Sequence, residues 1–224
     1  MKGRLFLSGG GNEKQTHSLD EIFMKDINTI LYIPLAWPNG DYNSCLEWFT
    51  KLMAQHKKKE IEIEMLIDLT KEIELTKYDA IYIGGGNTFK LLKLIKDSNF
   101  GKKLINYYNA GGTIYGGSAG AIILGRDINI ALICKDADVN KVKLKDTTGL
   151  SLIKNYDIQC HFEEDQIQEH IEYIKKTNRN IIAIPEVSAL LKEDNSYKAI
   201  GLKPITIISL EETKEFAPGE KIQI

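Results

Sequence analysis

The sequence predicts an α/β fold in which helices pack on both faces of a mostly parallel sheet. Along the first half of the chain, short β-branched runs alternate with longer amphipathic stretches, which is the order of elements that a parallel sheet requires. Two of the apolar runs end directly in glycine clusters, at Gly84–Gly86 and at Gly116–Gly120. A chain of 224 residues is long enough for one hydrophobic core, so we expect residues 1–224 to form a single domain.

The periodicity of apolar residues locates the elements of the first half. In the stretch from Tyr42, for example, Leu46, Phe49 and Met53 recur at helical spacing. The predicted strands are Arg4–Ser8, Thr29–Pro34, Glu62–Leu66, Ala80–Ile83 and Thr113–Tyr115. The predicted helices are Ser18–Lys25, Tyr42–Lys57, a short segment at Leu69–Leu75, Thr88–Lys96, Phe100–Asn109 and one that begins near Ala119.

The second half has a different pattern, with several short strand-like pieces after Leu124, one helix and a hairpin-like end. The helix is predicted at Glu164–Lys176 and is followed by an apolar run at Asn180–Pro185. The last strands are predicted at Ser188–Lys192, Ala199–Leu202 and Ile205–Leu210, with turn residues between them. We expect these strands to extend the sheet in antiparallel fashion.

Composition and charge exclude several classes of protein. The net charge is -2, and the densest basic run, Lys57–Lys59, is followed at once by glutamates, so no nucleic-acid partner is expected. Three cysteines without metal-ligand spacing argue against a disulfide framework and against a zinc site. The apolar run near the N-terminus is too short for a signal peptide or a membrane span. These features predict a cytoplasmic protein with no membrane partner.

The run Gly116-Gly117-Ser118-Ala119-Gly120 fits a nucleophile held in a sharp turn between a strand and a helix. Glycines on both sides of a serine allow neighbouring chain to approach closely, and the turn raises the hydroxyl above the end of the sheet. The Ala119 N–H would then point at a developing oxyanion. Two alternatives are a structural turn in which Ser118 caps a helix and a phosphate-binding loop, although no Gly-Lys-Ser/Thr pattern follows.

The second cluster, Gly84–Phe89, also ends a strand and opens a helix. Two such clusters after neighbouring parallel strands converge at the carboxyl edge of the sheet, where ligands bind. A nucleotide site is the alternative, but Asn87 and Phe89 offer no partner for a phosphate.

In order and spacing, Gly84–Phe89 with Lys90-Leu91-Leu92, followed by Gly116–Ala121, resembles the serine peptidases that include dipeptidase E and cyanophycinase. The resemblance extends from Tyr32–Trp37 to Pro185-Glu186 and the last strands. It implies a flavodoxin-like three-layer sandwich of the class I glutamine amidotransferase type, and a Ser-His-Asp or Ser-His-Glu catalytic set without metal or organic cofactor. By that similarity Ser118 is the nucleophile, and Gly85 (or Gly86) and Ala119 supply the oxyanion-hole amides.

His161 is the predicted base. It follows Ile158-Gln159-Cys160 at a strand end and precedes Phe162, and the family's base occupies a similar His-Phe position. The other histidines, His17, His56 and His170, lie in polar or charged stretches, and we expect them to be exposed. Cys160, next to the base, is a rival nucleophile, but its place on a strand favours a packed thiol.

The carboxylate that orients the base is predicted to be Asp138, with Asp136 as the second choice, because Asp138 keeps the family's spacing from His161 better. Asn87 and Glu186 are predicted to contact substrate. Glu186 follows Pro185, where the family also has Pro-Glu, and it could line the pocket or bind a substrate amine.

The sequence departs from the aspartyl dipeptidases at the residue before the nucleophile, where they tend to carry Trp and this chain has Gly117. Aspartyl specificity needs a cation, for which Lys90 and Arg126 are candidates. The prediction is a serine peptidase acting on short peptides, with N-terminal acidic dipeptides as the first substrates to test, as a monomer or homodimer. A catalytically silent binding protein on the same fold is the alternative. An α/β-hydrolase esterase would need its histidine nearer the end of the chain.

Overall fold

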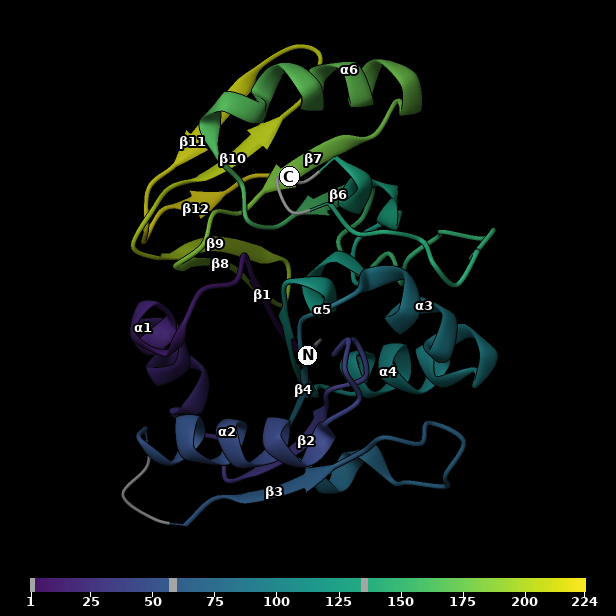
Figure 1. Cartoon of the computed structure of the whole chain (residues 1–224). Coiled ribbons are helices and arrows are strands. Elements are labelled where there is room, and N and C mark those ends of the chain that lie inside the picture. Colours follow the sequence, from purple (N-terminus) through teal and green to yellow (C-terminus); the bar gives the residue numbers. More distant parts are fainter. Residues whose placement is uncertain (1–2, 57–59, 134–136) are drawn as a thin grey trace.

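The computed structural model describes residues 3–56, 60–133 and 137–224. Eight strands of the described chain form the large sheet (Figure 1). In order across the sheet they are β12 (Lys221–Ile222), β9 (Ser196–Gly201), β8 (Ser188–Glu193), β1 (Arg4–Ser8), β5 (Thr113–Gly117), β4 (Ala80–Ile83), β2 (Thr29–Ile33) and β3 (Glu62–Met65). The five strands predicted in the first half are therefore confirmed to within one or two residues at each end.

The central strands run parallel, and this brings their carboxyl ends to one edge. Strand β5 pairs in parallel with β1 on one side and with β4 on the other. In this register Ser8 lies opposite Gly117, and Ile83 lies opposite Gly116. The two glycine clusters and the end of β1 are consequently neighbours at the same edge, as the parallel sheet requires.

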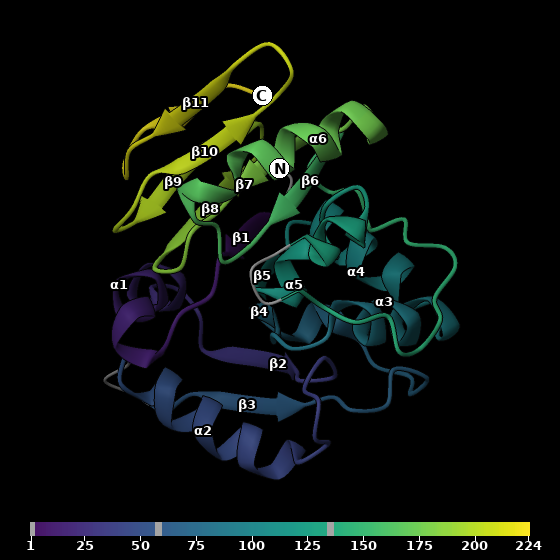
Figure 2. The same cartoon turned by 45° about the horizontal axis from the view of Figure 1, so that its top comes forward.

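Helices cover both faces of this sheet, and each face has its own apolar core. Helices α1 (Glu13–Met24) and α2 (Tyr42–Ala54) pack on the face that presents Phe6, Tyr32, Tyr82 and Tyr115. Helices α3 (Thr88–Asp97), α4 (Phe100–Asn109) and α5 (Ala119–Ile122) contribute to the core on the other face. Figure 2 shows α1 and α2 on one side and α3 to α5 on the other. The flavodoxin-like three-layer sandwich is confirmed.

A second sheet lies beyond the large one and is built from β11 (Thr213–Phe216), β10 (Ile205–Ile208), β7 (Asn180–Ala183) and β6 (Tyr156–Gln159). Helix α6 (Ile167–Thr177) packs against this sheet. The expected antiparallel extension of the large sheet is confirmed for β8 and β9. It is wrong for Ile205–Leu210, because Gly201, with φ of 110°, and Pro204 redirect the chain, and β10 pairs with β7 and β11 instead.

Three other local predictions need correction. Helix α1 begins at Glu13, before the predicted Ser18, because Asn12 forms a capping box with Gln15. The segment Leu69–Leu75 is not helical, and only a 3-10 turn, η1 (Leu75–Lys77), follows it. The first piece after Leu124 is a 3-10 helix, η2 (Ile128–Leu132), rather than a strand. A further 3-10 turn, η3 (Glu164–Gln166), precedes α6.

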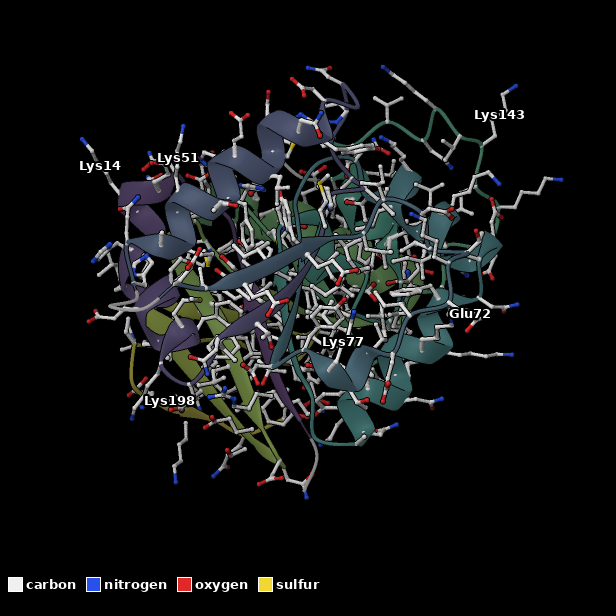
Figure 3. All side chains as sticks on the ribbon, turned by 90° about the horizontal axis from the view of Figure 1, so that it is seen from below. Lys14, Lys51, Glu72, Lys77, Lys143 and Lys198 are labelled. Atoms are coloured by element: carbon white, nitrogen blue, oxygen red, sulfur yellow. The ribbon has the colours of Figure 1, made fainter. Side chains whose placement is uncertain are left out.

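Charged side chains project from the periphery of the molecule in many directions. Figure 3 shows Lys14, Lys51, Glu72, Lys143 and Lys198 near the outline of the molecule, and Lys77 on the face turned to the viewer. Within the described ranges, no helix has the length and apolar composition needed to cross a membrane.

One carboxyl group is buried in the core beneath α1. Asp20 is 1% exposed, its Oδ2 accepts a hydrogen bond of 2.8 Å from Thr16 Oγ1, and its Oδ1 has no hydrogen-bond partner in the described chain. Burial raises the pKa of Asp20 to about 7, because the charged form loses its hydration without gaining a counter-charge.

The folded state therefore prefers Asp20 protonated, while the unfolded chain ionises it near its ordinary pKa of 3.8. Between these values the unfolded state binds fewer protons, so this group lowers the free energy of unfolding as pH rises from about 4 to about 7. We expect Asp20→Asn to be more stable than the parent by roughly 2–4 kcal/mol above pH 7, with the difference shrinking toward pH 4.

Urea unfolding of both proteins across this pH range measures the effect. Asp26→Asn, at an exposed position just beyond the same helix, is the matched control and should stay within about 0.5 kcal/mol of the parent. An Asp20→Asn variant no more stable than the parent at pH 7.5 would contradict the assignment.

Candidate active site

Ser118 occupies the sharp turn between β5 and α5. Its backbone has φ 48° and ψ -111°, a conformation that costs a non-glycine residue free energy and that is concentrated at functional sites. The Ser118 amide donates to the carbonyl of Ser8 at 3.0 Å, which ties the turn to the end of β1. This geometry matches a nucleophile elbow, in which the hydroxyl is held above the end of the sheet.

His161 and Glu186 complete a chain of hydrogen bonds that starts at this hydroxyl. Ser118 Oγ lies 2.8 Å from His161 Nε2, and His161 Nδ1 lies 2.9 Å from Glu186 Oε1. An ionised carboxylate only accepts hydrogen bonds, so the Nδ1 atom carries the proton and the Nε2 atom is free to accept from the serine. The side chains of His161 and Glu186 are 31% and 46% exposed, so substrate and water can reach them.

Three consecutive carbonyl groups at the end of β1 hold these residues in place. The carbonyl of Ser8 accepts from Ser118, that of Gly9 accepts from the His161 amide at 3.0 Å, and that of Gly10 accepts from the Val187 amide at 3.1 Å. Ser118, His161 and Val187 all have positive φ, at 48°, 54° and 69°. The loop after β1 thus holds three residues with strained backbone in place: Ser118, His161 and Val187, which follows Glu186.

Two glycines in this loop leave no room for a side chain. A Cβ on Gly9 would lie 2.2 Å from the carbonyl oxygen of Pro185. On Gly10, which has φ of 104°, a Cβ would lie 2.4 Å from Cε1 and 3.0 Å from Nδ1 of the His161 ring. The imidazole therefore rests directly on Gly10, and only glycine allows that approach.

Backbone amides beside Ser118 are available to a ligand. In the described chain the amides of Gly85 and Ala119 donate to no backbone carbonyl. Gly85 is in contact with the serine, since a Cβ on it would lie 3.3 Å from Ser118 Cβ and 3.8 Å from Ser118 Oγ. Gly86 packs instead against the carbonyl of Ala36. The sequence left Gly85 and Gly86 as alternative donors of an oxyanion-hole amide. In the structure Gly85 is the one beside the Ser118 hydroxyl.

The prediction that Asp138 orients His161 is wrong. Asp138 Oδ2 accepts from the amide of Thr88 at 2.8 Å, and its Oδ1 accepts from Asn87 Nδ2 at 3.2 Å. The carboxylate therefore binds the N-terminus of α3, where exposed amides favour negative charge. Spacing along the chain pointed to Asp138, but Glu186 reaches the imidazole because it follows β7, a neighbour of β6 in the second sheet. Asp136 lies outside the described residues.

Asn87 caps helix α3. Its Oδ1 accepts from the Lys90 amide at 2.9 Å, and its Nδ2 donates to Asp138 and to the carbonyl of Val139. The contact of Asn87 with substrate stays a prediction. Glu186, also predicted to contact substrate, has one carboxylate oxygen bound to His161.

The remaining candidates lie elsewhere. His17 and His56 stack on each other with ring centroids 4.6 Å apart. His170 was predicted to be exposed but is fully buried, and its Nδ1 contacts the carbonyl of Gln166 at 2.6 Å. Cys160 is fully buried, and its thiol lies 3.5 Å from the Ser8 carbonyl oxygen and 3.6 Å from that of Ser118. Burial beneath the turn makes Cys160 a packing residue.

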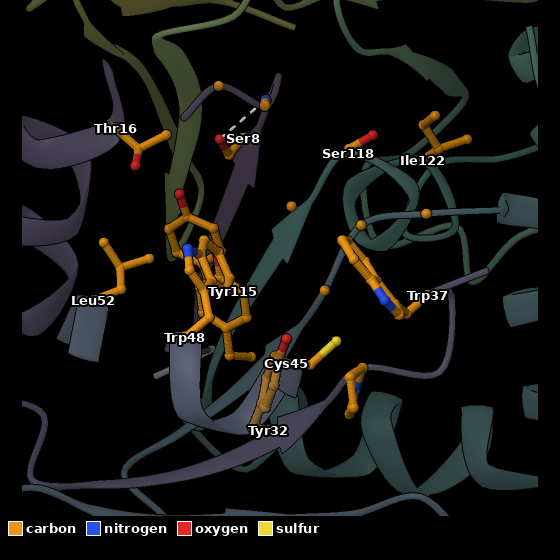
Figure 4. A pocket seen from close by; sticks show the side chains of 18 of the residues that line it. Ser8, Thr16, Tyr32, Trp37, Cys45, Trp48, Leu52, Tyr115, Ser118 and Ile122 are labelled. Carbon is orange, nitrogen blue, oxygen red and sulfur yellow. Dashed lines mark hydrogen bonds between the residues drawn. The ribbon is translucent and has the colours of Figure 1, made fainter. Parts of the chain in front are cut away.

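A cavity of about 670 Å³ opens beside Ser118. It extends from the serine over the sheet face that α1 and α2 cover, and Figure 4 shows Trp48 and Leu52 on one side with Trp37 and Ser118 on the other. Among the described residues, no group of three or more His, Cys, Asp or Glu side chains is arranged to hold a metal ion.

The model of peptidase family S51 matches residues 5–200 of the chain. The chain belongs to peptidase family S51. This S51 chain is 25% identical over 207 residues to "Peptidase E" of Nostoc sp. (strain PCC 7120), a match that covers 88% of this chain and 82% of that protein. It is 24% identical over 229 residues to "Peptidase E" of Pasteurella multocida, covering 93% of each.

A solved structure shares the fold of this S51 chain. The crystal structure of a peptidase from an acI-B1 Actinobacterium superposes with a TM-score of 0.73 at 21% identity, and the match covers 100% of this chain and 98% of that one. Membership of the family makes this chain a peptidase, and the dipeptidase E-type resemblance of its motifs is confirmed.

Two features of the site were not predicted from the sequence. The run Gly9–Gly11 directly after β1 was a third glycine cluster at a strand end, and it is the one that supports His161. The sequence predicts that the Glu186 carboxylate contacts substrate, whereas in the structure it binds His161.

The packing of His161 on Gly10 yields a test. In Gly10→Ala we expect the imidazole to shift, and labelling of Ser118 by an organophosphonate to slow about 100-fold, since a misplacement of about 1 Å has effects of this size. Gly40→Ala is the matched control, because Gly40 also has positive φ, 70°, but a Cβ there meets nothing within 4 Å. Equal labelling rates in Gly10→Ala and the parent, measured by mass spectrometry, would contradict the assigned contact.

Proposed function

We propose that this chain is a serine peptidase that hydrolyses short peptides through an acyl-enzyme on Ser118. The observation that carries the proposal is the hydrogen-bond chain from Ser118 Oγ through His161 to Glu186. A serine hydroxyl is a weak nucleophile by itself, and a base within hydrogen-bond reach that is oriented by a third group activates it. Family membership supports a peptide as the substrate.

In the acylation step, His161 Nε2 takes the proton of the Ser118 hydroxyl while Oγ attacks the carbonyl carbon of the scissile peptide bond. The carbonyl oxygen becomes an oxyanion, and the amides of Gly85 and Ala119, which donate to no backbone carbonyl in the described chain, are the donors beside it. Helix α5 has only four residues, so the amides themselves, rather than a helix dipole, supply the stabilisation. Collapse of this intermediate breaks the C–N bond, and His161 returns its proton to the leaving amine.

In the deacylation step, a water molecule takes the place of the amine. His161 removes a proton from this water, the hydroxyl attacks the acyl carbon, and the ester bond to Ser118 Oγ breaks as Oγ regains the proton. Glu186 accepts the hydrogen bond from Nδ1 throughout and stabilises the imidazolium that forms in each half of the cycle. It also keeps the proton on Nδ1, so that Nε2 always faces the serine.

The cavity supports a short peptide rather than a folded substrate. Its volume of about 670 Å³ lies in the range of sites for small ligands, about 300–1,000 Å³, which is room for a few residues. The two relatives described above are called "Peptidase E", which supports a peptide as the substrate.

Ser118 should be the single residue modified by an active-site phosphonate. We expect one adduct per chain, mapped by peptide mass spectrometry to Ser118, with no adduct in Ser118→Ala and slow labelling in His161→Gln. An adduct at another residue would overturn the proposal. An absence of any adduct, together with tight binding of a small metabolite, would favour a catalytically silent binding protein on this fold.

The roles of the two carboxylates can be separated by amide substitutions. Glu186→Gln keeps the shape of the side chain but no longer holds the proton on Nδ1, so we expect kcat for a dipeptide substrate to fall about 10⁴-fold. Asp138→Asn alters the cap of α3 but leaves the contact of His161 with Glu186 in place, so its main effect should be a loss of about 0.5–1 kcal/mol in the free energy of unfolding.

Steady-state kinetics and urea unfolding of the two variants measure these effects side by side. A larger loss of kcat in Asp138→Asn than in Glu186→Gln would contradict the assignment of Glu186 as the orienting residue.

A further inference from the structure

The walls of the cavity beside Ser118 are largely aromatic. Tyr82 and Tyr115 stack with ring centroids 4.4 Å apart on the sheet surface, and Tyr32 lies next to Tyr82 on the same face. Trp37 and Trp48 also line the cavity. Figure 4 shows Tyr115 and Trp48 on one side of the pocket, Trp37 on the other and Tyr32 below them.

The two tryptophans lie at the mouth of the cavity and remain partly open to solvent. Trp37 is 44% exposed and Trp48 is 42% exposed. Trp48 Nε1 donates to Glu13 Oε1, which fixes the indole between α1 and α2. Large apolar side chains that stay exposed around a cavity are typical of a site where an apolar group binds.

The charges around the cavity do not suit an acidic group. Among the lining residues that the structure describes, Asp138 is the one carboxylate, and no lysine or arginine is present. Lys90 Nζ instead donates to the carbonyl of Trp37 at 2.7 Å. Arg126 is exposed and not part of the lining. Asp20 adds a buried carboxyl behind Thr16, itself a lining residue.

Tyrosine hydroxyls and a cysteine thiol add uncharged polar groups to the wall. Burial raises the pKa of the Tyr32, Tyr82 and Tyr115 hydroxyls. Burial also raises the pKa of the Cys45 thiol. A substrate carboxylate that entered would lose its hydration without meeting a counter-charge among the described lining residues, which is unfavourable.

We propose that this cavity binds a large apolar side chain, aromatic above all, on the residue whose carbonyl is attacked by Ser118. The peptidase then prefers residues such as Phe over Asp at that position, contrary to the expectation of acidic dipeptides. The aromatic walls contribute ring–ring contacts in addition to burial of apolar area. This assignment rests on the proposed function for its placement of the substrate.

Intrinsic fluorescence reports directly on the site, because the chain has two tryptophans and both line the cavity. The Ser118→Ala variant, which cannot form the acyl-enzyme, is titrated with the dipeptides Phe-Ala and Asp-Ala. We expect a dissociation constant at least about tenfold lower for Phe-Ala, since apolar contacts of this size give discrimination of roughly 10–200-fold. Equal affinities, no binding of either dipeptide, or tighter binding of Asp-Ala would overturn the proposal.

A second substitution in the Ser118→Ala background tests the wall itself. Trp48→Ala should weaken Phe-Ala binding about tenfold and change Asp-Ala binding much less, with Trp37 left as the reporter. Leu210→Ala is the matched control, since Leu210 is also a large exposed apolar residue, at 55%, but does not line the cavity. Equal loss in both variants would overturn the role of Trp48.

Hydrolysis by the unmodified enzyme separates this inference from the proposed function. Faster cleavage of Asp-Ala than of Phe-Ala would leave the serine peptidase in place and overturn the aromatic preference. Preferred binding of Phe-Ala without cleavage of either dipeptide, and without labelling of Ser118, would overturn the proposed function and leave the cavity assignment in place.

Discussion

The site depends on three successive carbonyl groups at the end of β1. Those of Ser8, Gly9 and Gly10 accept hydrogen bonds from Ser118, His161 and Val187, which come from three distant parts of the chain. Each of these three residues has positive φ, a strained state that persists only where the surroundings fix it. Strand β1 and the loop after it therefore position Ser118, His161 and the residue after Glu186 relative to one another.

The two layers of helices have different roles around this edge. Helices α3 and α5 bury apolar residues beneath the glycine clusters, so the loops that carry Gly85 and Ser118 are supported from one face. Helices α1 and α2 cover the other face over a cluster of tyrosines and leave the cavity between themselves and the sheet. Hydrogen-bonded loops thus hold Ser118 and His161 on one side of this edge, and aromatic side chains line the cavity on the other.

Local signals in the sequence predicted most of the first half of the fold. The predicted bounds of the strands Arg4–Ser8 and Ala80–Ile83 agree with the structure residue for residue. Both are short apolar runs that end at a glycine, a pattern that favours a buried strand. Less was predictable after Leu124, where a 3-10 turn and long loops replace the expected strands. Strand Ile205–Ile208 pairs with β7 rather than with the large sheet. This pairing depends on contacts between distant parts of the chain, which the local alternation of apolar and polar residues does not predict.

For the site, the sequence by itself predicted the turn at Ser118 and the place of His161 beside it, since Gly-x-Ser-x-Gly after a strand and a histidine at a strand end are local patterns. Only the tertiary structure decided which carboxylate meets His161. Asp138 is nearer along the chain but binds the start of α3, whereas Glu186 arrives through the neighbouring strand β7. The cavity could likewise not be predicted from local sequence patterns, because its aromatic walls come from strands and helices that meet only when the sheet forms.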